Sequence, residues 1–260
     1  MESLIRTGTC EQVATVTLAR PELHNAFNDD MMRELTAAFE RFGAAPEVRV
    51  VVLASEGKNF CAGADIHWMK RMVGYSFEEN VADARVLSRM LRTIRECPKP
   101  VICRVQGATY GGGVGLVAAC DISVALSSSS FCLSEVKLGI LPAVISPFVL
   151  EKIGPGAARR YAISAEVFSA AEAHRIGLVN EVVDGVEEMD AWTAKIAGAI
   201  AANGPTAVAE CKRILSDVVG TPWDRVEDIT TKKIAELRVA PEGQEGLRAF
   251  LEKRKPGWVS

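Results

Sequence analysis

Residues 101–115 decide the fold, and they read VICRVQGATYGGGVG. The apolar run Val101–Val105 comes after two prolines and has the composition of a buried strand. Five glycines then occur within nine residues, and the apolar residues 116–120 beyond them indicate a buried helix. A glycine run between a strand and a helix lets backbone amides approach a ligand without an obstructing side chain. We therefore expect a ligand site here, with close packing alone as the less favoured explanation of the glycines.

Amides of this kind can hold either a phosphate or an oxygen that becomes negative during a reaction. Residues 113–118 fit the G-x-G-x-x-G/A pattern of dinucleotide sites. That pattern needs its glycines directly after the strand and an acidic residue at the end of the next strand. Here seven residues, 106–112, intervene, and the next strand, 122–126, is followed by four serines. The sequence therefore argues against a nicotinamide or flavin site.

The composition is that of an ordinary globular protein. The chain has 260 residues, of which 48% are hydrophobic and 24% charged, so it can bury a sizeable core. Its net charge of −3 argues against a general binder of nucleic acid or anionic membranes. The chain opens without a basic, apolar signal segment and has no apolar run of membrane-spanning length. We expect a cytoplasmic protein.

The seven cysteines are scattered and form no C-x-x-C pair, and none of the three histidines lies in a metal-binding motif. This pattern is typical of reduced, buried thiols and predicts no metal site. Cys61 and His67 are candidates for a thiolate pair, but they share one short loop, which disfavours catalytic use.

Strands and helices alternate as far as a predicted strand at 178–182, and only helices are expected from Val186 onward. The fold class is therefore α/β. We divide the chain into a core, 1–195, and a C-terminal helical region, 196–260. This region is too short for a large core of its own, so it should pack on the core or on another subunit.

Two loops of small residues, Gly63–Ala64 and Gly111–Gly113, each follow a buried strand. Two amides that converge from different strands would form an oxyanion hole. Glu135 comes next, in an apolar setting that should raise its pKa and suit it to proton transfer. The alternative is that Glu135 caps a helix or pairs with a cation.

Several segments together resemble the enoyl-CoA hydratase/isomerase (crotonase) family, and the resemblance covers nearly the whole chain. They are residues 20–26, 60–66, 106–113, 119–122, 135–142, 171–179 and 250–254. The resemblance implies a spiral of ββα units and a helical C-terminal region used to form trimers, usually paired into hexamers.

The resemblance also implies roles for individual residues. The amides of Ala64 and Gly112 would hold a thioester oxygen, and Glu135 falls on one of the family's two catalytic glutamates. Coenzyme A would enter as part of the substrate, with no permanently bound cofactor. Its site would be lined by Ala62, Ala64, Asp65 and Ile66, with Phe250 and Lys253 contributed from a neighbouring subunit.

One departure from the family pattern concerns the second catalytic glutamate, whose position here is Gly115. Asp121 is no substitute, because it starts a strand and is expected to be structural. Either Glu135 performs both proton transfers, or the reaction needs one carboxylate.

Residues 133–139 and 142–147 resemble bacterial methylglutaconyl-CoA hydratases of leucine breakdown, and so does the 110–115 loop with its last glycine. Such a substrate carries a distal carboxylate, which Lys70 and Arg71, or Arg85, Arg89 and Arg92, are candidates to meet. A solvated basic face is the alternative for each. Three functions stay open: an acyl-CoA hydratase (a lyase), an isomerase or decarboxylase on the same scaffold, and a non-catalytic acyl-CoA-binding protein.

Overall fold

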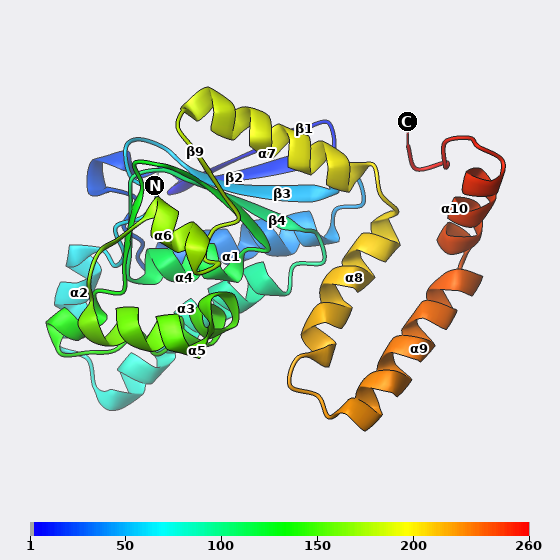
Figure 1. Ribbon diagram of the computed structural model, residues 1–260. Coiled ribbons are helices and arrows are strands. Elements are labelled where there is room, and N and C mark those ends of the chain that lie inside the picture. Colours follow the sequence, from blue (N-terminus) through cyan, green and yellow to red (C-terminus); the bar gives the residue numbers. More distant parts are fainter. Residues whose placement is uncertain (1–2, 260) are drawn as a thin grey trace.

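A computed structural model describes residues 3–259 and contains two β-sheets (Figure 1). The larger sheet has six strands, with β1 antiparallel to β2 and all other neighbours parallel. In spatial order they are β1 (Ile5–Cys10), β2 (Val13–Leu18), β3 (Val50–Ser55), β4 (Val101–Val105), β6 (Ile122–Leu126) and β9 (Glu181–Val183). The smaller sheet consists of β5 (Ala108–Tyr110), β7 (Ser130–Cys132) and β8 (Phe168–Ser169).

Ten α-helices and two 3-10 helices connect and cover these strands within the described range. The first group is η1 (Pro21–Leu23), α1 (Asp29–Ala44), α2 (Ile66–Met72), α3 (Phe77–Arg95), α4 (Gly112–Ala119) and η2 (Glu135–Leu138). The second is α5 (Ser146–Ser164), α6 (Ala170–Arg175), α7 (Val186–Ala201), α8 (Pro205–Val218), α9 (Trp223–Val239) and α10 (Pro241–Leu251).

The chain winds as a spiral in which successive turns add a strand to each sheet and then a helix. One turn runs β4, β5, α4, and the next runs β6, β7 and η2 to α5. The predicted α/β spiral of ββα units is confirmed. Its consequence is that β5 and β7 lie side by side in parallel, which brings the segments after them together.

β3 is buried along its whole length because both faces of the larger sheet are covered. Val51 and Leu53 lie in the main core with α1, α3 and α4, whereas Val50 and Val52 pack against Ala197 of α7. This explains why β3 carries apolar side chains on both of its faces.

The expected order of glycine loop followed by helix is wrong in one respect, since α4 begins at Gly112, inside the glycine run. The reason is steric. A Cβ on Gly112 would lie 2.2 Å from Phe27 Cζ, and one on Gly113 would lie 2.5 Å from the Cys61 carbonyl oxygen. The glycines therefore serve close packing at the same time as they expose the first amide of the helix.

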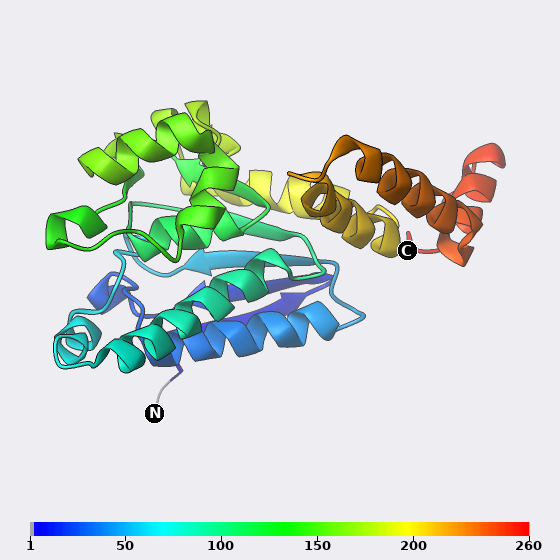
Figure 2. The same cartoon turned by 90° about the horizontal axis from the view of Figure 1, so that it is seen from below.

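Helices α8 to α10 extend away from the sheets as an arm (Figures 1 and 2). The predicted boundary at 195/196 falls inside α7, whose Ala197 packs on the larger sheet, so the arm itself begins at α8. The division into two parts stays a prediction. Within residues 3–259, no helix combines the length and apolarity needed to cross a membrane.

Asp121 ties the arm to the body of the protein. Its Oδ2 accepts hydrogen bonds from the Val101 amide and from Lys212 Nζ of α8, each at 2.7 Å. Arg95 Nη1 lies 3.6 Å from Oδ1, and Lys152 Nζ donates to the Asp121 carbonyl oxygen at 2.8 Å. These contacts give Asp121 the structural role expected from the sequence.

Asp121→Asn should lower the free energy of unfolding by about 2 to 4 kcal/mol, because it leaves the largely buried Lys212 ammonium without its counter-charge. Urea unfolding of the variant measures this loss. The control is Asp228→Asn on the exposed side of α9, which should change stability by no more than about 0.5 kcal/mol. Equal stability of the two variants would contradict the assigned role of Asp121.

Candidate active site

The two loops of small residues lie against each other. Cys61 and Thr109 form a parallel β-bridge, and the Tyr110 amide donates to the Cys61 carbonyl oxygen at 2.9 Å. Gly63 has φ +98°, and a Cβ there would lie 3.1 Å from the Tyr110 carbonyl oxygen. The loop after β3 is thus joined to β5, the strand that leads into Gly111–Gly113.

Phe27, which was not predicted from the sequence, binds the loop after β3 through its backbone. Its amide donates to the Gly63 carbonyl oxygen at 2.9 Å, and its own carbonyl accepts from the Asp65 amide at 3.0 Å. A buried aromatic in a polar loop, directly after Asn25-Ala26, was the available signal.

Asn25 fixes the backbone around this site. It is fully buried, and its side chain accepts from the Arg20 amide and donates to the carbonyls of Glu56 and Asn59, all at 2.8 to 2.9 Å. One amide side chain thereby joins the loop after β2 to the loop after β3.

The amides of Ala64 and Gly112 have no partner within the described part of the chain. Gly112 is the first residue of α4, so its amide lies at the positive end of the helix dipole. Gly111 before it has φ +52° and ψ −123°, a backbone conformation that favours glycine. Two unpaired amides on joined loops can stabilise a developing negative oxygen.

Glu135 lies beside these loops at the start of η2. Its Oε1 would be 3.3 Å from a Cβ on Gly111, and its Oε2 is buried with no hydrogen-bond partner. Burial raises the pKa of this carboxyl group above its ordinary value. Among residues 3–259 Glu135 forms no salt bridge, and Ser134 holds the N-cap position of η2. Glu135 is therefore neither a helix cap nor the partner of a cation.

Gly115 faces a filled space rather than an open one. A Cβ there would lie 2.4 Å from Ile145 Cγ2 and 3.6 Å from Leu91 Cδ1. Ile145 and Leu91 are both buried. Apolar packing therefore occupies the position where the family pattern has its second glutamate.

The predicted coenzyme A residues fall into two groups. Ala62 to Ile66 lie at the site, but the Asp65 carboxylate already caps α2 through the His67 and Trp68 amides and pairs with Arg20 at 2.8 Å. The Asp65 amide donates to the Phe27 carbonyl oxygen and the Asp65 carbonyl oxygen accepts from the Met69 amide, so the polar groups of Asp65 are engaged within the chain. Phe250, 82% exposed, lies in α10 and Lys253 follows that helix, and α10 lies far from α4, the helix that begins at Gly112 (Figure 1).

Thiolate chemistry by Cys61 and His67 does not fit this site. Cys61 is fully buried, and this burial raises the pKa of its thiol to about 12, whereas His67 is exposed. The thiol is therefore protonated near neutral pH. In the chain from 3 to 259, no group of three or more His, Cys, Asp or Glu side chains is arranged to hold a metal ion.

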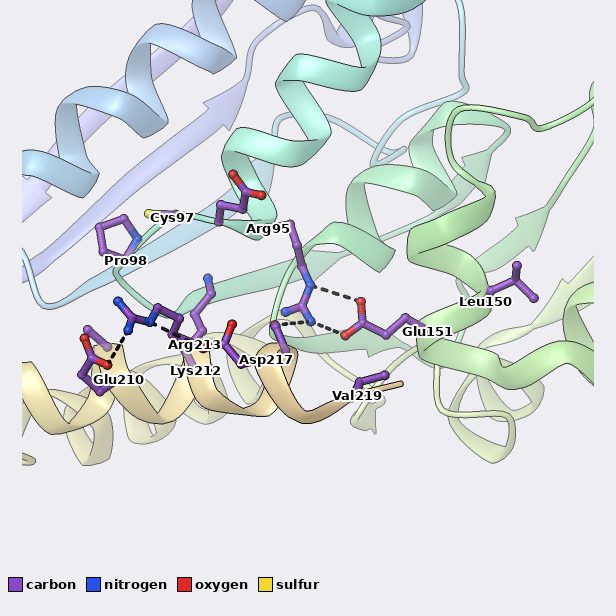
Figure 3. A pocket seen from close by; sticks show the side chains of 13 residues that line it. Arg95, Cys97, Pro98, Leu150, Glu151, Glu210, Lys212, Arg213, Asp217 and Val219 are labelled. Atoms are coloured by element: carbon purple, nitrogen blue, oxygen red, sulfur yellow. Dashed lines mark hydrogen bonds and ion pairs between the residues drawn. The ribbon is translucent and has the colours of Figure 1, made fainter. Parts of the chain in front are cut away.

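A cavity of about 840 Å³ lies elsewhere, between the ends of α3 and α5 and the arm helix α8 (Figure 3). Many of its charged side chains are paired with one another, Arg95 with Glu151 and Arg213 with Glu210 and Asp217. None of the predicted site residues lines it. It lies at the junction of the arm and the body.

Comparison with known proteins gives a consistent result. The family model described as enoyl-CoA hydratase/isomerase matches residues 8–260. A crotonyl-CoA hydratase from Syntrophomonas wolfei is 35% identical over 252 residues, which cover 96% of this chain and 95% of the relative. A short-chain-enoyl-CoA hydratase from Clostridium acetobutylicum is also 35% identical, over 251 residues, with coverage of 94% and 93%.

The structure has a close counterpart among solved proteins. An enoyl-CoA hydratase from Shewanella pealeana superposes with a TM-score of 0.95 at 41% identity. The match covers 98% of this chain and 96% of the other. Sequence and structure thus agree over almost the full length.

Glu135→Gln should stabilise the fold increasingly as pH rises. A carboxyl whose pKa is raised by folding contributes stability below its unfolded pKa and loses it as pH rises through the folded pKa. Glutamine does not ionise, so the variant escapes this loss. Each tenfold difference in ionisation constant between folded and unfolded chain corresponds to about 1.4 kcal/mol.

Thermal unfolding at about pH 5 and about pH 8 measures the effect, with exposed Glu47→Gln as the control. The stability gained by Glu135→Gln should be larger at the higher pH, whereas the control should show no such trend. A gain that shrinks with rising pH would mean that the Glu135 carboxylate is stabilised by folding.

Proposed function

Since this chain belongs to the enoyl-CoA hydratase/isomerase family and is an enzyme of that family, we propose that it adds water to the double bond of a 2-enoyl-CoA. The observation that carries the proposal is the desolvated, unpaired carboxyl of Glu135 next to the two free amides. Two relatives named as hydratases, the crotonyl-CoA and short-chain-enoyl-CoA enzymes, support the same reaction.

In the proposed mechanism, the amides of Ala64 and Gly112 donate to the thioester oxygen. Ionised Glu135 takes a proton from water, and the oxygen of that water forms a bond to C3 of the enoyl group. The electron pair of the double bond moves onto the thioester as an enolate, which the two amides stabilise. Glu135, now protonated, returns a proton to C2, so that one water has been added.

A raised pKa suits both steps. Near neutral pH the carboxylate is a stronger base than an ordinary glutamate, and its protonated form remains acidic enough to protonate an enolate carbon. Glu135 performs both transfers because Ile145 closes the space beside Gly115. No second carboxyl is required if base and acid act in sequence on one face of the substrate.

Isomerisation of the double bond is the second candidate. The closed space at Gly115 favours it specifically, because moving a proton between two carbons needs one carboxyl and no water. The same two amides would stabilise the dienolate. Hydration is preferred on the strength of the named relatives.

We further propose 3-methylglutaconyl-CoA as a substrate, which requires a cation for its distal carboxylate. Three of the five candidate cations already have partners: Arg71 pairs with Asp29, Arg89 with Glu40 and Arg92 with Glu96. Lys70 and Arg85 have no salt bridge among residues 3–259. Lys70 is favoured because it lies in α2, the helix that starts directly after the Ala62–Asp65 loop.

The active enzyme is proposed to be a trimer or a dimer of trimers. Large apolar side chains are exposed on all three arm helices, and surface of this kind is normally buried against a partner. Examples are Leu215, Val219, Trp223, Val239, Leu247, Phe250 and Leu251. In such an assembly Phe250 and Lys253 would reach the coenzyme A of a neighbouring subunit. Arg254 would not, because it pairs with Glu245 and Glu252.

Glu135→Gln should reduce kcat by about 100- to 10,000-fold while coenzyme A affinity stays within about threefold, because only the proton chemistry is lost. The assay follows loss of the conjugated thioester absorbance of crotonyl-CoA, with mass spectrometry of the product. Hydration adds the mass of water, and isomerisation leaves the mass unchanged. Turnover of the purified variant close to that of Glu47→Gln would rule out the single-glutamate mechanism.

Lys70→Met should raise KM for 3-methylglutaconyl-CoA by about 10-fold. KM for crotonyl-CoA, which lacks the distal carboxylate, should change by no more than about twofold. Steady-state kinetics with both substrates give the comparison, and Lys58→Met is the control on an exposed loop. Equal effects on the two substrates would remove Lys70 as the carboxylate partner.

The intact 28.0 kDa chain should form particles of three or six subunits in light scattering. Phe250→Ala and Lys253→Ala should each weaken coenzyme A binding about 3- to 30-fold without changing that number. Lys232→Ala, exposed on α9, is the control for the loss of a cation. A monomeric chain, or variants with the affinity of the control, would contradict the proposed assembly.

A further inference from the structure

Phe27 contacts both loops that carry the proposed oxyanion amides. Its backbone forms a parallel β-bridge with Ala64, made by the hydrogen bonds to Gly63 and Asp65 on either side. The position of the Ala64 amide is therefore fixed relative to the Phe27 backbone.

The ring of the same residue lies against Gly112. A Cβ on Gly112 would be 2.2 Å from Cζ, 2.8 Å from Cε1 and 3.4 Å from Cε2 of Phe27. Distances this short mean that the ring edge fills the space that any other residue at 112 would need. The first residue of α4 thus rests on the tip of the Phe27 ring.

The ring has little freedom to move. Phe27 is only 1% exposed, and its centroid lies 6.1 Å from that of Trp68. Trp68 is itself fixed, because its Nε1 donates to Asp83 Oδ1 at 2.9 Å. A chain of contacts therefore runs from α3 through α2 to the ring and on to the first residue of α4.

We propose that Phe27 is a positioning residue that sets the separation of the Ala64 and Gly112 amides: its backbone holds one and its ring supports the other. This inference rests on the proposed function, since it assumes that these two amides bind the thioester oxygen. Phe27 touches no reacting atom and acts only through the geometry of the two donors.

Two substitutions alter the support in opposite directions. Phe27→Leu shortens the side chain and removes the surface on which Gly112 rests. Phe27→Tyr adds an oxygen to Cζ, the ring atom nearest Gly112, and so pushes against the start of α4. Because donors of an oxyanion hole act at short range, either displacement should weaken charge stabilisation in the transition state.

The test measures kcat and KM of each variant with crotonyl-CoA. It also measures the absorbance maximum of an aryl-acrylyl-CoA bound to the same variants in a Glu135→Gln background, where turnover is blocked. Hydrogen bonds to the thioester oxygen polarise the conjugated system and shift its absorbance to longer wavelength. We expect kcat to fall about 10- to 100-fold with KM within about threefold, and the wavelength shift to shrink.

Phe39→Leu is the matched control, because Phe39 is equally buried, at 1% exposure, in α1. It should lower thermal stability as Phe27→Leu does, yet retain kcat and the absorbance shift. If Phe27→Tyr fails to fold, the comparison of kcat and absorbance shift between Phe27→Leu and Phe39→Leu still tests the positioning role of Phe27.

The outcomes separate the two levels of the proposal. If the unsubstituted Phe27 protein in the Glu135→Gln background binds the thioester without any shift, the oxyanion site itself is wrong. If that shift is present and both Phe27 variants retain it together with kcat, the amides act without help from Phe27. If Phe39→Leu lost kcat and the absorbance shift as Phe27→Leu does, the effect of Phe27 would come from core packing in general.

Discussion

The structure depends on the close approach of the first turn of α4 to the loop that follows β3. Gly112 and Gly113 lie so near Phe27 and Cys61 that no larger residue fits at either position. This steric constraint leaves the first amide of a helix beside a second free amide from another turn of the spiral. The spiral supplies the two segments, and the glycines let them meet.

The electrostatics of the site depend on a single carboxyl group. Glu135 lies at the same junction with one oxygen buried and unpaired, which raises its pKa. Ile145 occupies the space beside Gly115, so an apolar side chain fills that position. The proposed chemistry therefore combines one base of raised pKa with two fixed donors. The family relationship places the chain among enzymes, and the choice between water addition and isomerisation lies in how this single carboxyl is used.

Much of this arrangement is predictable from local sequence. The strand at Val101–Val105 follows directly from an apolar run. The apolar setting of Glu135 also indicated its raised pKa. These features depend on neighbours in the chain, which a single sequence displays.

Other features arise from tertiary contacts that no local pattern reveals. The need for glycine at position 112 comes from the Phe27 ring, 85 positions earlier in the chain. The space beside Gly115 is closed by Ile145, which belongs to a later turn of the spiral. The position of the family's second glutamate is therefore filled by apolar packing. The roles of Phe250 and Lys253 depend on a second chain and remain predictions.

The central claim is that one carboxyl on one face of the substrate carries out both proton transfers. Hydration of crotonyl-CoA in D₂O tests it most directly, with NMR coupling constants of the 3-hydroxyacyl product giving the configuration at C2. A single Glu135 predicts that deuterium and hydroxyl are added to the same face of the double bond. Addition to opposite faces, or deuterium distributed over both, would require a second acid or solvent and would contradict the account.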